Sequence, residues 1–261
     1  MKSLRLAVLA LAVSLSACKS MPGSESDINA VLAASGLESQ LAWLRQPLQE
    51  DRTSGPLALI PDDWIRVVNA TVAETVKPGD IRGALYDEMK KSLSGSELAQ
   101  VRRFYESDVG RKVVAVEGGR LQGRTGSAAL NDATLDALAS ATGLGKAVSL
   151  LAENALGDAV DIALKTGCLG EQPGYAKLLG GVMKKAQLLA LRNAVNDSIR
   201  ERYASLSSQE QSMYLDFARS GAGQKFFSTR TTVLNDFAQK AGNMLGAQLT
   251  PRINEVCKSS A

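Results

Sequence analysis

Few side chains in this 261-residue sequence have the types that perform acid–base or nucleophilic chemistry. The chain has no histidine, which excludes histidine general acids and bases, histidine-activated nucleophiles and histidine metal ligands. Asp158 and Asp161 lie three residues apart on an expected helix, where they could bind a cation or form an acid–base pair. The same spacing is typical of a solvated helix face. We therefore expect no enzymatic activity, no cofactor and no metal site.

Some lysine and tryptophan residues of the chain are of types that often contact ligands or partners in other proteins. Lys112 and Lys225 recur at equivalent places near expected helix starts, where they could bind phosphate or simply face solvent. Trp43 and Trp64 could line a groove or touch a partner, although core packing is the better explanation for both. The pair Asp62–Asp63 is better interpreted as a helix N-cap.

The amino terminus carries an export signal. Lys2 and Arg5 precede an apolar run, Leu6–Leu15, which is too short to span a bilayer as a helix. The following "LSAC" resembles the lipobox of bacterial lipoproteins. This resemblance implies cleavage before Cys18, lipidation of its thiol and acylation of the new amino terminus. The alternative is an ordinary secretory signal followed by a chance cysteine.

These features predict a lipid-anchored protein of the cell envelope. Residues 1–17 form the signal peptide, and the polar residues 18–26 form a flexible tether. Each buried methylene of an acyl chain contributes about 0.8 kcal/mol, so several chains anchor stably. Lys19 follows the cysteine, and the sorting rule of enteric bacteria then places the protein at the outer membrane, facing the periplasm.

The charge balance argues against nucleic acid as a partner. The sequence has 30 Lys and Arg against 27 Asp and Glu, and loss of Lys2 and Arg5 leaves 28 against 27, a net charge of +1. Nucleic-acid binding requires a basic patch, which this composition does not favour. The membrane is expected to be reached through the acyl chains on Cys18.

The two cysteines that follow Cys18 form an even pair in an oxidising compartment. We expect Cys168 and Cys257 to be joined by a disulfide, with two buried free thiols as the alternative. A loop of this length would contribute about 4–5 kcal/mol in the chain-entropy account.

The sequence predicts an all-α fold. Five of the seven prolines lie at or before Pro78, and the long segments after it are rich in helix-forming residues. Ile81, Leu85 and Met89 are spaced four apart, as on the buried face of a helix.

One pattern occurs twice. Leu93–Lys112 and Leu206–Lys225 align at an offset of 113 with seven of 20 positions identical. Serine and glutamate begin both stretches in the order of a capping box, and a second serine precedes a glycine, as at a tight corner between two helices. The expected structural residues are Ser94, Glu97, Ser107, Gly110, Ser207, Glu210, Ser220 and Gly223.

An earlier pair of stretches, starting at Ile28 and Leu135, also aligns, at an offset of 107. Long-period self-similarity is typical of duplicated supersecondary units. We therefore predict two tandem helical repeats, residues 27–127 and residues 132–261.

The stretch "LSGSELAQVRRFYESDVGRK" resembles the signature of a bacterial envelope family known as domain of unknown function 2059. Both copies depart from the signature where proline is common, at Asp108 and Gly221. The second copy is the weaker match, because Ala218 stands where an aromatic residue would follow Phe217. The resemblance implies a helical, exported protein and no assigned activity.

The sequence thus predicts a non-enzymatic envelope lipoprotein that acts as a scaffold or accessory factor for a protein partner. One alternative is a carrier that holds an apolar ligand or lipid between the two repeats. A second alternative is an enzyme that uses carboxylates.

Overall fold

The computed structural model of the chain is all-α, as the sequence predicts. The structure describes residues 23–37, 39, 62–75, 77–118, 132–143, 145–146, 149–150, 189, 193, 196–197 and 199–259, and these contain no β-strand. Within the same residues, no helix is both long and apolar enough to cross a membrane.

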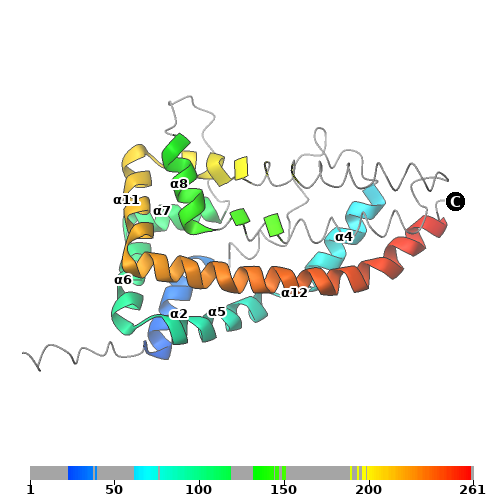
Figure 1. Cartoon of the computed structure of the whole chain (residues 1–261), viewed down its shortest axis with the longest axis horizontal. Coiled ribbons are helices and arrows are strands. Elements are labelled where there is room, and N and C mark those ends of the chain that lie inside the picture. Colours follow the sequence, from blue (N-terminus) through cyan, green and yellow to red (C-terminus); the bar gives the residue numbers. More distant parts are fainter. Residues whose placement is uncertain are drawn as a thin grey trace, which may run out of the picture.

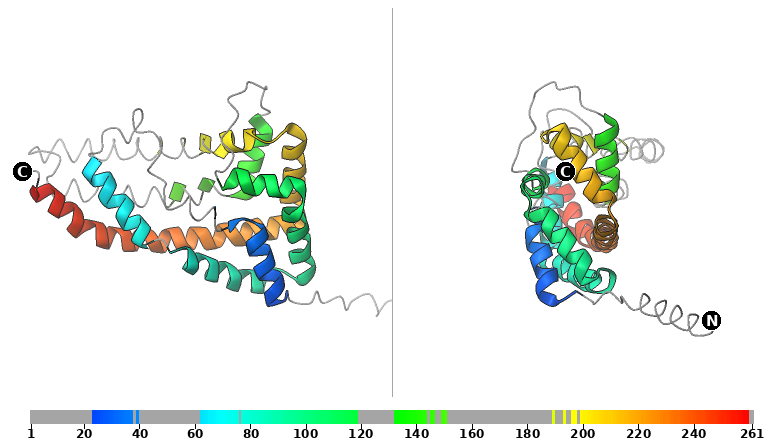
Figure 2. Two further views of the ribbon diagram at one scale, coloured as in Figure 1. Left: turned by 180° about the vertical axis from the view of Figure 1, so that it is seen from behind. Right: turned by 90° about the vertical axis from the view of Figure 1, so that its left-hand side faces the viewer.

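One long helix organises the described part of the molecule. Helix α12 spans Gly221–Ser259 and packs against helices from both halves of the sequence (Figure 1). Helices α6 (Gly95–Glu106) and α11 (Ser208–Arg219) lie at the end of the molecule where α12 begins, as the reverse view also shows (Figure 2). The other helices whose bounds the structure gives are α2 (Glu25–Ala34), α4 (Asp62–Thr75), α5 (Pro78–Ser92), α7 (Asp108–Glu117) and α8 (Asp132–Thr142).

The buried apolar side chains form one hydrophobic core. The expected face of α5 is confirmed, because Ile81, Leu85 and Met89 are all buried. The core combines side chains from residues 27–127 with others from residues 132–261, so both ranges contribute to the same cluster. The boundaries of the two predicted repeats stay a prediction.

Helices α6 and α11 begin in the same way. The Ser94 hydroxyl accepts a hydrogen bond from the Glu97 N–H, and the Glu97 carboxylate accepts one from the Ser94 N–H. Ser207 and Glu210 repeat this arrangement at the start of α11. Both predicted capping boxes are therefore present, and each helix contains 12 residues.

The turn after α8 also has a counterpart near the amino terminus. Gly36 and Gly143, which align at the offset of 107, both have positive φ, +66° and +64°. A side chain at either position would be strained. A Cβ would also lie 2.2 Å from Val114 at the first glycine and 2.2 Å from Thr231 at the second, so each turn packs tightly on a later helix.

Several predicted features lie outside the described residues. They are the signal peptide and Cys18, Trp43, the carboxylates Asp158 and Asp161, and Cys168 of the expected disulfide. Cys257 and Trp64 belong to α12 and α4, but their side chains are not among those described. These expectations stay predictions.

Candidate functional site

Two tight helix corners, one in each repeated stretch, position the functional region. Ser107 ends α6 and caps α7, because its hydroxyl accepts a hydrogen bond from the Gly110 N–H at 3.1 Å. Ser220 and Gly223 form the same bond at 3.1 Å between α11 and α12. The predicted corners are thus confirmed, and at each corner the glycine lies against the main chain of the preceding helix.

The corners bring the two repeated stretches face to face. Phe104 and Phe217, which are equivalent at the offset of 113, stack with their ring centroids 3.9 Å apart and their planes 5° apart. Tyr105 and Phe226 meet beside this stack. Aromatic side chains therefore fill the contact between the stretches, which leaves no apolar cavity at the stack itself.

Two reciprocal ion pairs flank the stack. Lys112 Nζ lies 2.7 Å from a carboxylate oxygen of Glu210, and Lys225 Nζ lies 2.6 Å from one of Glu97. The lysine of each stretch thus forms an ion pair with the capping glutamate of the other stretch. This reciprocity is the geometry of a two-fold interface. The expectation that both lysines simply face solvent missed this pairing.

The lysines change the acidity of the capping carboxylates. The hydrogen bond from Lys225 lowers the pKa of Glu97, and the one from Lys112 lowers the pKa of Glu210. A lowered pKa in the folded state contributes stability above the ordinary glutamate pKa, and this stability is lost as the pH falls through the lowered value.

A buried charged network lies behind the same contact. Glu117 and Arg230, also equivalent at the offset of 113, form an ion pair at 3.4 Å with side chains 0% and 2% exposed. Tyr203 and Tyr214 donate to the Glu117 carboxylate at 2.8 Å and 2.5 Å. Arg230 also donates to the main-chain oxygen of Thr142 at 3.0 Å, which ties α12 to the end of α8.

Both tyrosines of this network are held in their protonated form. Burial, followed by the nearby Glu117 carboxylate, raises the pKa of Tyr203 and Tyr214 well above the usual range. They therefore act as hydrogen-bond donors at every physiological pH. The network is buried, and its bonds connect α8, α11 and α12 to one another and to Glu117 on α7.

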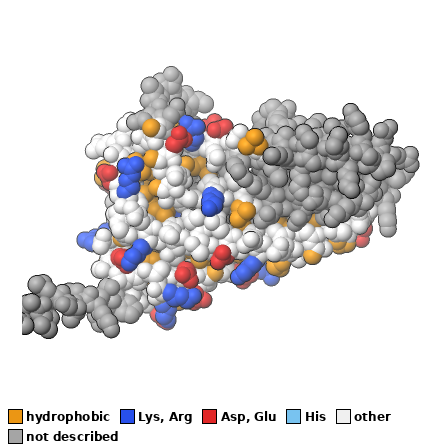
Figure 3. Space-filling model, in the orientation of Figure 1, with side chains coloured by type: hydrophobic (Ala, Val, Ile, Leu, Met, Phe, Trp, Pro, Cys, Tyr) orange, Lys and Arg blue, Asp and Glu red, His pale blue; other side chains and the backbone are white. Residues whose placement is uncertain are grey.

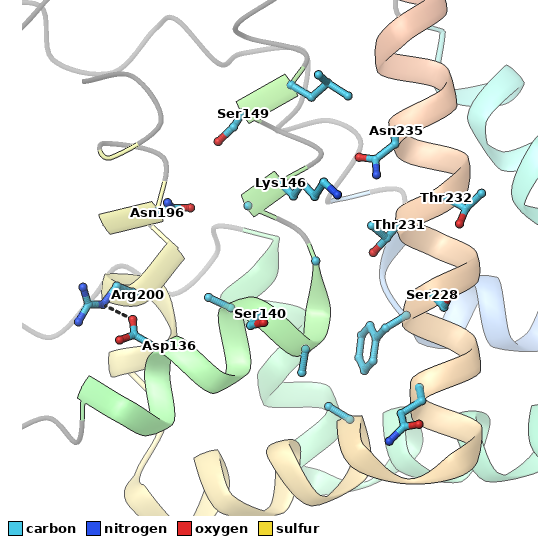
Figure 4. Close-up of a pocket in the computed structure, with 18 of the residues that line it drawn as sticks. Asp136, Ser140, Lys146, Ser149, Asn196, Arg200, Ser228, Thr231, Thr232 and Asn235 are labelled. Atoms are coloured by element: carbon cyan, nitrogen blue, oxygen red, sulfur yellow. Dashed lines mark ion pairs between the residues drawn. The ribbon is translucent and has the colours of Figure 1, made fainter. Parts of the chain in front are cut away.

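Those three helices form much of the wall of a cleft of about 1380 Å³, which we call the polar cleft (Figure 4). Its side chains come from α8, α11, α12 and the described residues between 145 and 200. Hydroxyl and carboxamide groups contribute much of this lining: Ser140, Ser149, Asn193, Asn196, Gln224, Ser228, Thr231, Thr232 and Asn235. Apolar side chains such as Leu150 and Phe227 also line it. The lining therefore suits a ligand that combines hydrogen-bonding groups with some apolar surface.

Among the described residues of the cleft, two buried polar atoms have no hydrogen-bond partner. They are the hydroxyl oxygen of Ser149, a residue only 4% exposed, and the carboxamide oxygen of Asn235. Buried polar atoms are nearly always hydrogen-bonded, so such exceptions require an explanation. A ligand that supplies the missing partners is one.

The charged residues of the cleft are separated in space. Asp136 pairs with Arg200 at 3.4 Å at one end, and Lys146 extends toward α12 elsewhere in the cleft (Figure 4). Asp136 and Asp197 are exposed, and among the described residues no group of three or more Cys, Asp or Glu could hold a metal ion. The described lining therefore offers hydrogen bonding and charge recognition.

On the face seen in Figure 3, basic and acidic side chains are interspersed over the described surface.

The polar cleft was not foreseen from the sequence, because its residues come from segments far apart and share no spacing motif. The only local signal is the polar run "STRTTVLND" on α12, which supplies Ser228, Thr231, Thr232 and Asn235.

Comparisons with protein-family models, with curated proteins and with solved structures found no match to this chain. The resemblance of "LSGSELAQVRRFYESDVGRK" to a family signature thus stays a prediction.

Proposed function

We propose that this protein is a non-enzymatic lipoprotein of the bacterial envelope that binds a segment of a partner protein in the polar cleft. Acyl chains on Cys18 hold it at the outer membrane, and the folded part faces the periplasm. The observation that carries the binding role is the set of unpartnered polar atoms in the cleft, at Ser149 and Asn235.

The helical frame around the cleft supports a scaffold role. The buried Glu117–Arg230 pair and the stacked Phe104–Phe217 rings fix the helices that carry the cleft residues. Helices held by such contacts lose little conformational entropy on binding, which favours recognition of a defined segment. The reciprocal contacts between the two stretches also support an origin by duplication.

The two alternatives from the sequence have less support. A carrier of an apolar ligand needs an apolar cavity between the repeats, whereas the contact there is filled by stacked rings and the cleft beside it is lined by many hydrogen-bonding and charged groups. A carboxylate enzyme needs clustered acidic groups, whereas Asp136 and Asp197 of the cleft are exposed and Asp136 is paired with Arg200.

Replacing Cys18 by serine tests the membrane anchor. The variant cannot receive the thioether-linked lipid, so we expect the precursor to remain uncleaved or the chain to appear in the soluble periplasmic fraction. Cell fractionation with a protein blot and the intact mass of the purified chain measure this. Cleaved Cys18→Ser protein that stays in the outer membrane would contradict the lipid anchor.

A photo-crosslinking amino acid placed at Thr232 tests the partner. Thr232 is exposed and lines the cleft, so we expect irradiation of living cells to give one discrete adduct with another protein. The matched control is Lys240, which is exposed on the same helix outside the cleft lining. Adducts from the Lys240 position alone would contradict binding through the polar cleft.

A further inference from the structure

Lys146 is one of two cations of the polar cleft, with Arg219, that form no ion pair among the described residues. Its side chain is exposed and extends toward α12, on the side of the cleft where Asn235 and Thr231 lie (Figure 4). Among the described residues it forms no ion pair, whereas Arg200 in the same cleft pairs with Asp136. Lys146 is thus available to bind an anionic group of a ligand.

The groups near Lys146 suit the main chain of a peptide. A hydroxyl such as that of Ser149 both donates and accepts, and a carboxamide such as that of Asn235 offers an acceptor and two donors. A peptide presents N–H donors and carbonyl acceptors in alternation. The unpartnered oxygen of Asn235 can accept from a peptide N–H, and the buried hydroxyl of Ser149 can donate to a carbonyl.

The size of the cleft favours an extended segment over a small metabolite. Its volume of about 1380 Å³ exceeds the roughly 300–1,000 Å³ that is typical of small-molecule pockets. The charged side chains of its lining are Lys146, Arg200 and Arg219 against Asp136 and Asp197, one positive charge in excess. An occupant with a single negative charge would balance this lining.

We propose that the polar cleft binds an acidic peptide segment, with a carboxylate of that segment paired to Lys146 and its main chain hydrogen-bonded to Asn235 and Ser149. The carboxylate can belong to an Asp or Glu side chain or to the carboxyl terminus of the partner. This inference rests on the proposed function, because it specifies the chemistry of the segment that the cleft receives.

The test uses the full lipidated chain in detergent and a positional-scanning hexapeptide library, made once with free and once with amidated carboxyl termini. Retained peptides are counted by mass spectrometry. We expect Asp or Glu at one position, or the free carboxyl terminus, to be favoured about fivefold over the neutral equivalent, the size of an accessible ion pair. Lys146→Gln should abolish this preference, whereas Lys240→Gln should leave it unchanged.

The outcomes separate the two proposals. Peptides that are retained, and lost in Asn235→Ala, but that show no acidic preference would overturn the inference and keep cleft binding. The same holds for an acidic preference that persists in Lys146→Gln. No retained peptides, or equal retention by the parent chain and Asn235→Ala, would overturn the proposed function as well. Melting temperatures of the variants verify that each is folded.

Discussion

Replacing Glu117 by glutamine is expected to lower the free energy of unfolding by about 3–5 kcal/mol, the usual cost of breaking a buried ion pair on one side. The amide oxygen of glutamine can still accept from Tyr203 and Tyr214, so those two bonds are kept. The amide has no charge, however, and the guanidinium of Arg230, which is 2% exposed, would lose the negative charge of Glu117 while it stays buried. Chemical denaturation of the parent and variant chains measures the difference.

Two further variants test whether loss of the buried ion pair causes the lower stability of Glu117→Gln. Glu106→Gln removes the carboxylate of an exposed pair with Arg102 and should leave the free energy of unfolding nearly unchanged. The double variant Glu117→Gln/Arg230→Gln removes both buried charges, so we expect it to be more stable than Glu117→Gln alone. If the double variant is as unstable as the sum of both single changes, the ion pair is not the source of the effect.

The local features of the two repeated stretches could be predicted because they depend on residues close in sequence. A capping box needs only a serine and a glutamate three positions later, and the chain supplies this twice, at Ser94 and Ser207. The apolar face of α5 likewise follows from spacing within one helix. The all-α class follows from such local signals.

The partners of Lys112 and Lys225 could not be predicted in this way. Each pairs with a glutamate about one hundred residues away, and only the packing of the two stretches brings them together. The repeat itself contained a clue, because two copies that meet about a two-fold axis make every contact reciprocal. A proposed contact between one lysine and the opposite glutamate would then have implied the second.

Glu117 and Arg230 show a second reason why parts of the structure could not be predicted from the sequence. They occupy equivalent positions at the offset of 113 and lie next to each other, yet one is acidic and the other basic. Charged residues are rarely buried unless they are paired, so sequence reasoning places both at the surface. The polar cleft was missed for a related reason, since Lys146, Ser149 and Asn235 meet only through the packing of the chain against α12.

Replacing Gly110 by alanine is expected to lower the free energy of unfolding by about 3 kcal/mol, the upper part of the usual range for overpacking. An added Cβ would lie 2.0 Å from the main-chain oxygen of Phe104 and 2.6 Å from the Cα of Tyr105. Main-chain atoms cannot move aside as the end of a flexible side chain can. The clash must therefore shift α7 against α6 and disturb the ring stack at Phe104.

The chain offers a matched control and an internal repeat of this experiment. Gly83 lies exposed within α5 with nothing near its added Cβ, so Gly83→Ala should raise the free energy of unfolding by about 1 kcal/mol. Gly223→Ala should be as destabilising as Gly110→Ala, because its Cβ would lie 1.9 Å from the main-chain oxygen of Phe217. Thermal and chemical unfolding of the three variants measure these effects. Similar decreases in the free energy of unfolding at Gly110 and Gly223 would mean that both corners contribute equally to stability. A Gly110→Ala protein as stable as the parent would contradict the prediction, because α7 could then move away from α6 without cost.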